Sequence, residues 1–217
     1  MSAASDDEST SKFITISTQD NTNQDNYKLL IGSILPRPIA FVSTQSAEGI
    51  LNLAPFSFFT GVCSNPPTLL FCPMIRGSDG HRKDTLLNIE ETGEFVVNVV
   101  SEAIVERMNK TAAEVPPEVS EFELAELTPV QSSIIKPPRV LEAPISMECR
   151  LQQIIPVGSG NPGSGAVVLG TILQFHIRAD LYQNGRIDTE TLKPVSRLAG
   201  TAYAPVRDIF ELVRPTR

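Results

Sequence analysis

Residues 76–85 read R-G-S-D-G-H-R-K-D-T and join a basic, glycine-containing loop to the expected start of a helix. Asp84 or Thr85 can cap a helix that we expect from about Leu86 to Glu91, with Gly93 ending it. Helix-start amides and nearby cations both favour an anion, so this loop is the best phosphate-binding candidate. An ordinary solvated loop with an ordinary cap is the alternative, and composition alone favours that alternative.

A second group of polar residues lies between positions 37 and 59. We expect a β-hairpin there, with an apolar run at 39–42, a turn at 45–49 and an alternating segment at 51–54 that Pro55 interrupts. Its polar residues are expected to converge on one end, and they are Ser43, Thr44, Asn52 and Ser57. Its apolar wall would come from Phe41, Leu53, Phe56, Phe58 and Phe59. This mixture suits a planar, partly apolar, hydrogen-bonding ligand, although each polar residue alone is also routine turn chemistry.

The segment from Gly158 to Gly163 matches the dinucleotide-binding pattern G-x-G-x-x-G. That fold needs a helix after the glycines, whereas Pro162 and Gly165 lead here into an apolar segment of strand character. We therefore interpret the segment as a flexible hairpin loop.

Histidines and cysteines give no sign of a metal site or a hydrolytic triad, because their spacing fits neither. The histidines are His81 and His176, and the cysteines are Cys63, Cys72 and Cys149. We expect His176 on a strand face and Cys149 in the core, and we leave open whether either takes part in chemistry.

The remaining elements must bring the hairpin and the basic loop together. Further strands are expected at 68–75, 94–100, 145–157, 166–177 and 210–213, a second helix at 101–109, and a tight turn at Asn184-Gly185. Several strands with turn signals and only two convincing helices predict an antiparallel barrel rather than a β-α-β array.

Two segments lie outside this pattern. Residues 111–144 are rich in proline, with a short helical stretch near 120–126, and we expect them to wrap the barrel beside the ligand or a partner subunit. Residues 1–26 have a polar composition without a signal-peptide pattern, so we expect a disordered or weakly ordered extension before one domain at 27–217. An apolar patch at 13–16 would add an edge strand.

Composition restricts the partners. The chain has 217 residues, a net charge of -7, 41% hydrophobic and 20% charged residues. This acidic balance argues against nucleic acid, and the apolar runs are too short to cross a bilayer. We expect a cytoplasmic protein with no membrane or nucleic-acid partner.

Six segments together resemble one known family, the flavin reductase-like family of FMN-binding split β-barrels, which includes the flavoredoxins. They are R-P-I-A-F-V-S-T at 37–44, N-L-A-P-F-S-F-F at 52–59, R-K-D-T-L-L-N-I at 82–89, E-F-V-V-N-V at 94–99, M-E-C-R-L at 147–151 and S-R-L-A-G-T-A-Y at 196–203. The resemblance covers roughly residues 26–215. One departure is Ala199, where the family commonly has glycine.

The resemblance implies a mainly β fold, an antiparallel Greek-key split β-barrel with a few peripheral helices. It also implies non-covalent FMN near the interface of a homodimer. The basic loop and helix start would hold the phosphate and ribityl chain, the hairpin would hold the isoalloxazine ring, and two arginines would contact ligand or partner. The candidate cofactor-binding residues are Arg37, Ser43, Thr44, Asn52, Ala54, Pro55, Ser57, Arg82, Lys83, Asp84, Thr85 and Arg197.

The resemblance implies an enzyme in which NADH or NADPH delivers a hydride to flavin N5. No catalytic side chain is expected, because the protein would mainly position the two rings and support the flavin's charge. One alternative is an FMN-binding electron carrier, like a flavoredoxin, that a partner protein reduces. Another is a flavin-free barrel that has kept only the fold.

Overall fold

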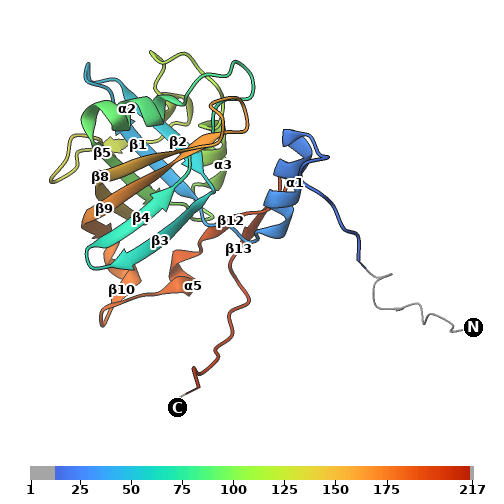
Figure 1. The fold of residues 1–217 in the computed structure, drawn as a ribbon. Helices are drawn as coiled ribbons and strands as arrows, with labels where there is room; N and C mark the ends of the chain where they lie inside the picture. The colour runs from blue at the N-terminus through green and yellow to red at the C-terminus, as the bar shows by residue number, and fades with distance from the viewer. Residues whose placement is uncertain (1–12, 216–217) are drawn as a thin grey trace, which may run out of the picture.

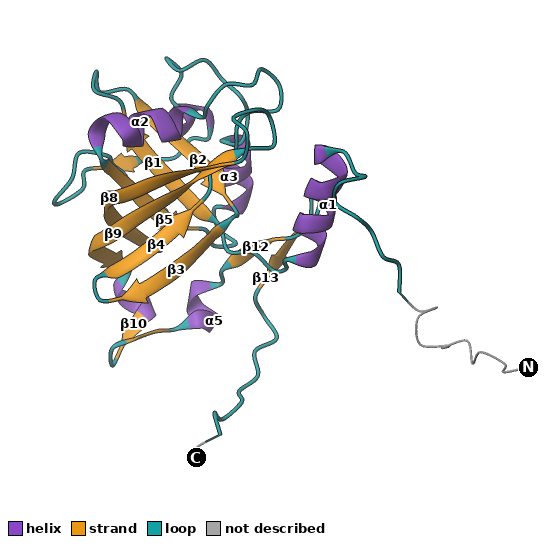
Figure 2. Cartoon of the chain, in the orientation of Figure 1, coloured by secondary structure: helices purple, strands orange, loops and turns teal. Residues whose placement is uncertain are grey.

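A single antiparallel sheet dominates the computed structural model, which describes residues 13–215 (Figures 1 and 2). Its seven strands lie in the order β2-β1-β5-β8-β9-β4-β3. They are β1 (Ala40–Gln45), β2 (Leu51–Phe56), β3 (Phe59–Ser64), β4 (Pro67–Phe71), β5 (Glu94–Val99), β8 (Ile145–Val157) and β9 (Gly165–Ile177). The prediction of a mainly β, antiparallel fold is confirmed.

Short helices and strand pairs surround the sheet. The helices are α1 (Asn23–Ser33), α2 (Asp84–Thr92), α3 (Val105–Lys110), α4 (Glu121–Leu124), α5 (Thr189–Leu192) and the 3-10 turn η2 (Ala179–Leu181). The strand pairs are β6 (Pro129–Val130) with β7 (Arg139–Val140), β10 (Tyr182–Gln183) with β11 (Arg186–Ile187), and β12 (Val195–Arg197) with β13 (Tyr203–Pro205). Helix α2 covers one end of the barrel, whereas α1 lies to one side with β12 and β13 (Figure 1).

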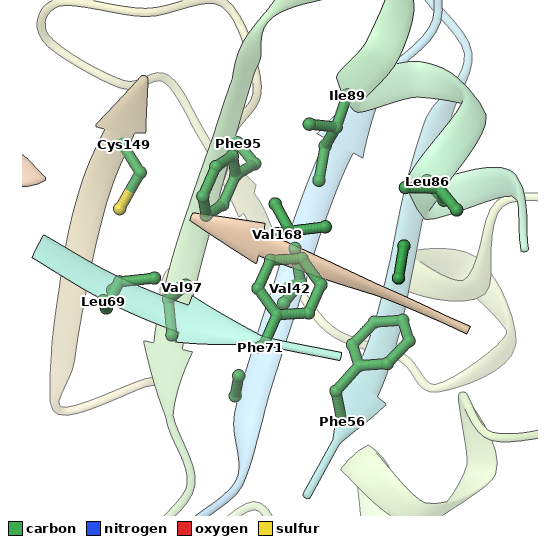
Figure 3. Packing of buried hydrophobic residues seen from close by; sticks show 12 residues of the cluster. Val42, Phe56, Leu69, Phe71, Leu86, Ile89, Phe95, Val97, Cys149 and Val168 are labelled. Carbon is green, nitrogen blue, oxygen red and sulfur yellow. The ribbon is translucent and has the colours of Figure 1, made fainter. Parts of the chain in front are cut away.

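Three phenylalanines from three strands fill the inside of the barrel (Figure 3). The rings of Phe56 and Phe71 have centroids 5.1 Å apart, and those of Phe71 and Phe95 are 5.5 Å apart. Leu86 and Ile89 of α2 pack against the same cluster. The core therefore fixes the position of α2 relative to the hairpin.

The hairpin is also buried on its outer face. Side chains alternate along a strand, so Ala40 and Val42 point into the barrel while Phe41 points outward. Phe41 packs there with Met108 of α3 and Phe122 of α4. Residues 111–144 thus cover this face, as the sequence predicted for a long wrapping connection.

The structure confirms the central predicted elements. The predicted hairpin is β1 and β2, the first helix is α2, and the strand expected at 145–157 is β8. Pro55 lies inside β2 and does not interrupt it, because β2 is an edge strand, where sheets tolerate proline. The Asn184-Gly185 turn joins β10 to β11, with both residues at positive φ.

Other predicted elements are wrong or shorter. Residues 13–16 and 210–213 form no strand, and the strand expected at 68–75 ends at Phe71. The second helix begins at Val105, because Ser101 pairs in extended conformation with Pro194 instead of capping a helix.

Helix α1 begins within the predicted N-terminal extension. Its cap is Thr22, whose hydroxyl accepts the amide N–H of Asp25 at 3.1 Å. Residues 13–22 of that extension form no helix or strand, and residues 1–12 lie outside the described residues. Across residues 13–215, no helix is both long and apolar enough to cross a membrane.

Candidate functional site

A cavity of about 110 Å³ lies where the hairpin, the start of α2 and the chain after α3 meet. Its walls bring together most of the predicted ring and phosphate residues. They are Asn52, Ala54, Pro55 and Phe56 from β2; Arg76, Lys83, Asp84 and Thr85 around the start of α2; and residues 111–115 with Glu121 from the connection. The two polar groups predicted from the sequence thus share one cavity.

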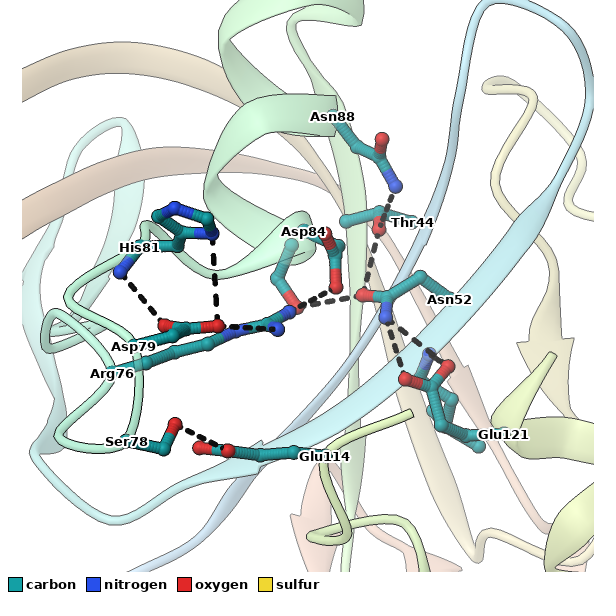
Figure 4. Close-up of polar contacts among 12 residues, drawn as sticks. Thr44, Asn52, Arg76, Ser78, Asp79, His81, Asp84, Asn88, Glu114 and Glu121 are labelled. Atoms are coloured by element: carbon teal, nitrogen blue, oxygen red, sulfur yellow. Dashed lines mark hydrogen bonds and ion pairs between the residues drawn. The ribbon is translucent and has the colours of Figure 1, made fainter. Parts of the chain in front are cut away.

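Asn52 is the centre of a hydrogen-bond network in this cavity (Figure 4). Its Oδ1 accepts the hydroxyl of Thr85 at 2.6 Å and that of Thr44 at 3.2 Å. Thr44 Oγ1 in turn accepts Nδ2 of Asn88 at 3.0 Å. This network joins both strands of the hairpin to α2.

Glu121 binds the other side of Asn52. Asn52 Nδ2 lies 2.9 Å from Oε1 and 3.1 Å from Oε2 of Glu121, and the Leu53 N–H donates to Oε2 at 2.9 Å. The side chain is buried, and this burial raises the pKa of Glu121, with a further contribution from the nearby Asp84 carboxylate. Sequence analysis did not predict a role for Glu121, although it did expect residues 111–144 to lie beside the ligand or a partner subunit.

Among the described residues, no side chain caps the start of α2. Lys83 occupies the cap position in extended conformation, and the first-turn amides of Asp84 and Thr85 have no acceptor within the helix. The predicted caps are wrong, because Asp84 pairs with Arg76 and the Thr85 hydroxyl bonds Asn52. These amides are therefore available to an anion.

Arg76 adds a second anion-binding feature. One end of its guanidinium pairs with Asp84, while its Nε is buried and has no hydrogen-bond partner among the described residues. Three carboxylates also line the cavity, Asp84, Glu114 and Glu121, so its charge is mixed. Within this wall, the amides of the helix start, Arg76 and Lys83 all lie around the start of α2, so that is where we expect an anion.

Six of the predicted residues lie outside the cavity wall, namely Arg37, Ser43, Thr44, Ser57, Arg82 and Arg197. Ser43 points to the outer face of the hairpin and donates to the carbonyl of Pro138 at 2.5 Å. Arg37 is buried and donates to the carbonyls of Ile31, Ile34 and Leu198, and its Nε donates to the Ser57 hydroxyl at 3.3 Å. The expected convergence of four hairpin polar groups is therefore wrong for Ser43 and Ser57. Arg197 stacks on Tyr203, with its guanidinium carbon 4.5 Å from the ring centroid.

Arg82 faces a neighbouring hollow of about 440 Å³ and pairs there with Glu90. Lys83 lines both this hollow and the smaller cavity. Of the two basic residues, Lys83 is therefore the one that can reach an anion at the helix start. The cofactor roles of all these residues stay predictions.

Comparison with known proteins shows which protein family this chain resembles. The flavin reductase like domain matches residues 31–191. The structure is similar to that of nitrilotriacetate monooxygenase component B from Bacillus cereus, with 46% identity, a TM-score of 0.88, and coverage of 92% of this chain and 98% of that one. It is also similar to the 2-nitrobenzoate 2-nitroreductase of Pseudomonas fluorescens, with 34% identity, a TM-score of 0.84, and coverage of 94% and 97%.

A protein from Shewanella frigidimarina, described as a putative flavin reductase with a split barrel domain, shares 22% identity at a TM-score of 0.80, over 94% of this chain and 100% of that one. This likeness shows the fold, so the split-barrel prediction is confirmed. An uncharacterised protein of Halalkalibacterium halodurans is 45% identical over 196 residues, which are 90% of this chain and 93% of that protein.

The chain belongs to the flavin reductase-like family. This membership supports a flavin-using oxidoreductase with flavin as its ligand. It leaves open which flavin, which electron donor and which oligomer this chain uses.

Proposed function

We propose that the protein is an FMN-binding oxidoreductase that uses NADH or NADPH to reduce flavin. The observation that carries this proposal is the uncapped start of α2, which lies beside Arg76 and Lys83 in a cavity shared with the hairpin. Amides, cations and a partly apolar wall in one place suit a ligand with a phosphate at one end and a ring at the other. Two similar proteins support the same class, since their names describe a monooxygenase component and a nitroreductase.

The phosphate would bind at the α2 start. The amides of Asp84 and Thr85 would donate to it, with Lys83 and the unpartnered Nε of Arg76 supplying positive charge. Asp84 would not touch the phosphate, because its carboxylate pairs with Arg76. The ring would lie along Ala54, Pro55 and the neighbouring part of β2.

The cavity is too small for a whole flavin cofactor. It measures about 110 Å³, whereas ligand pockets usually measure about 300 to 1,000 Å³. The rest of the cofactor therefore needs another wall. A second copy of the chain would supply one, which supports the homodimer that the resemblance implies.

The bound flavin would supply the redox chemistry by accepting a hydride from the nicotinamide. The chain's own residues would hold and orient it. Thr44 and Thr85 both direct their hydroxyl protons at Asn52, so neither can donate to the flavin ring. Donors to the ring's polar edge would then be main-chain N–H groups rather than the predicted hydroxyls.

Titration of the purified protein with FMN, followed by quenching of flavin fluorescence, tests the first part of this proposal. We expect saturable binding of one FMN per chain. A colourless protein that leaves FMN fluorescence unchanged would point to a flavin-free barrel.

Anaerobic mixing of the FMN-loaded protein with NADH or NADPH tests the second part. We expect one of the two to bleach the flavin absorbance at a catalytic rate. Bleaching only in the presence of a reduced partner protein would instead identify an electron carrier.

A further inference from the structure

Glu121 is a buried carboxylate at the cavity wall, and it comes from a part of the chain distant from both sequence motifs of the site. We propose that Glu121 is a positioning residue that orients the Asn52 amide and thereby makes Thr85 a hydrogen-bond acceptor for an alcohol group of the bound flavin. This inference rests on the proposed function and adds to it a residue and a direction of hydrogen bonding.

The Glu121 carboxylate sets the orientation of the Asn52 amide. Both of its oxygens face N–H groups, namely Asn52 Nδ2 at 2.9 and 3.1 Å and the Leu53 amide at 2.9 Å. At a pH above its raised pKa, the Glu121 carboxylate is ionised and can only accept hydrogen bonds. Asn52 must therefore turn its nitrogen toward Glu121 and its oxygen toward the opposite side.

The position of Asn52 Oδ1 in turn sets the direction in which two threonine hydroxyls donate. Asn52 Oδ1 can only accept, and the two groups that face it are the hydroxyls of Thr44 and Thr85. Each hydroxyl has a single proton, and here that proton points at Asn52. Both threonines can therefore only accept a hydrogen bond from any further group.

Thr44 and Thr85 differ in whether another side chain already donates a hydrogen bond to their hydroxyl oxygen. Asn88 Nδ2 already donates to Thr44 Oγ1 at 3.0 Å. Thr85 is only 1% exposed but lines the cavity, and among the described residues its hydroxyl has no hydrogen bond other than the one to Asn52. A ligand group that meets Thr85 must be a donor, such as an alcohol, because carbonyl and phosphate oxygens only accept. The main-chain amides of Asp84 and Thr85 suit the phosphate, whereas the Thr85 hydroxyl oxygen suits an alcohol, so the cavity distinguishes the two polar parts of a hydroxylated phosphate chain.

The test compares FMN with lumiflavin, which has the same ring but neither ribityl chain nor phosphate. In Glu121→Gln, the new amide nitrogen would face Asn52 Nδ2 or the Leu53 N–H, so Asn52 would lose its fixed orientation. We expect FMN to bind at least about tenfold more weakly, as for one lost hydrogen bond to a ligand, while lumiflavin affinity changes less than about twofold. Equal weakening of both ligands would overturn the proposal, because it would mean general damage to the site.

A double variant at positions 52 and 121 tests the same hydrogen-bond directions even if the single variant folds poorly. In the double variant Asn52→Asp with Glu121→Gln, the new amide at position 121 can donate to the new carboxylate at position 52. That carboxylate can still accept both threonine hydroxyls. We expect each single variant to unfold at a lower temperature than wild type, and the double variant to recover both stability and FMN affinity. A double variant no better than the worse single variant would contradict the assigned hydrogen-bond directions.

The matched control is Glu123→Gln, which removes an exposed carboxylate from the same short helix. It should leave stability and FMN affinity unchanged. If wild type binds no flavin at all, the proposed function fails, and the part of this inference that concerns an alcohol on the ligand fails with it. The unfolding temperatures of the four combinations at positions 52 and 121 would still decide whether Glu121 orients Asn52.

Discussion

The side chains in and beside this cavity differ in whether they already have an ion pair or hydrogen bond with a neighbouring group. Asp84 pairs with Arg76, Arg82 with Glu90, and Asn52 with Glu121 and two threonines. Lys83 lines the cavity and has no ion pair or hydrogen bond from its side chain among the described residues. An anionic ligand can therefore bind the Lys83 ammonium group without breaking an existing ion pair.

Replacing Lys83 with alanine should therefore weaken FMN binding. We expect a loss of about 1 to 3 kcal/mol, the usual range for a charge-assisted hydrogen bond. Fluorescence titration measures it, with Lys110→Ala, an exposed position at the end of α3, as the control for a lost surface charge. An FMN affinity equal to that of the control would remove Lys83 from the site.

The pKa of Glu121 predicts a pH dependence of stability. Burial raises this pKa in the folded protein, so the folded state keeps the proton over a range where the unfolded chain has lost it. The contribution of Glu121 to the free energy of unfolding must then fall as pH rises through that range. The range extends from the ordinary carboxyl pKa of about 4.3 up to the raised value.

Urea unfolding of wild type and Glu121→Gln at several pH values between about 4 and 7 measures this dependence. The free energy of unfolding of wild type, relative to that of the variant, should decrease as pH increases. A difference that stays constant, or that grows with pH, would contradict the raised pKa.

Among the larger elements, the connection from 111 to 144 depends on a buried polar anchor. Glu148 of β8 is fully buried and accepts the amide N–H groups of Ser133 at 2.6 Å and Ile134 at 2.8 Å. His176 Nε2 lies 2.6 Å from the same carboxylate. Burial alone would raise the pKa of Glu148, but these hydrogen bonds outweigh it and lower the pKa.

Glu148→Ala should destabilise the protein by about 2 to 4 kcal/mol, because the main-chain N–H groups of Ser133 and Ile134 and the His176 ring would lose a charged hydrogen-bond partner. Urea unfolding measures the loss. Glu118→Ala, an exposed position in the same connection, is the control and should stay within about 0.5 kcal/mol of wild type. A loss as small as that of the control would show that the anchor contributes little.

Across the molecule as a whole, the sheet closes tightly around one aromatic side chain. A Cβ added to Gly170 of β9 would lie 2.3 Å from Cζ and 2.9 Å from Cε1 of Phe95. Phe95 is fully buried and in contact with Phe71, so its ring cannot move aside. Glycine is therefore required at this position by packing across the barrel.

Gly170→Ala should lower the free energy of unfolding by about 1 to 3 kcal/mol, the usual cost of overpacking a core. Thermal or urea unfolding measures it, and Gly61→Ala is the control, because no atom lies within 4 Å of a Cβ at that strand position. Partial recovery in Gly170→Ala with Phe95→Leu would assign the cost to this contact. No recovery would place its cause elsewhere.

The amino-acid sequence was sufficient for the elements that local rules encode. Alternation and turn residues predicted the hairpin at 37–59 and the strand at 145–157, and Gly93 marked the end of α2. The basic residues before α2 and the polar residues of the hairpin indicated the two halves of the site. Six motifs in order indicated the family, which comparison with known proteins then showed.

The contacts between polar side chains were decided only by the tertiary structure. The alternation of side chains placed Ser43 on the opposite face from Thr44, although the two residues are adjacent in sequence. Folding also brought Glu121 to Asn52 across 69 positions of the chain. No periodicity or spacing records such a contact, because it depends on how the long connection packs on the sheet.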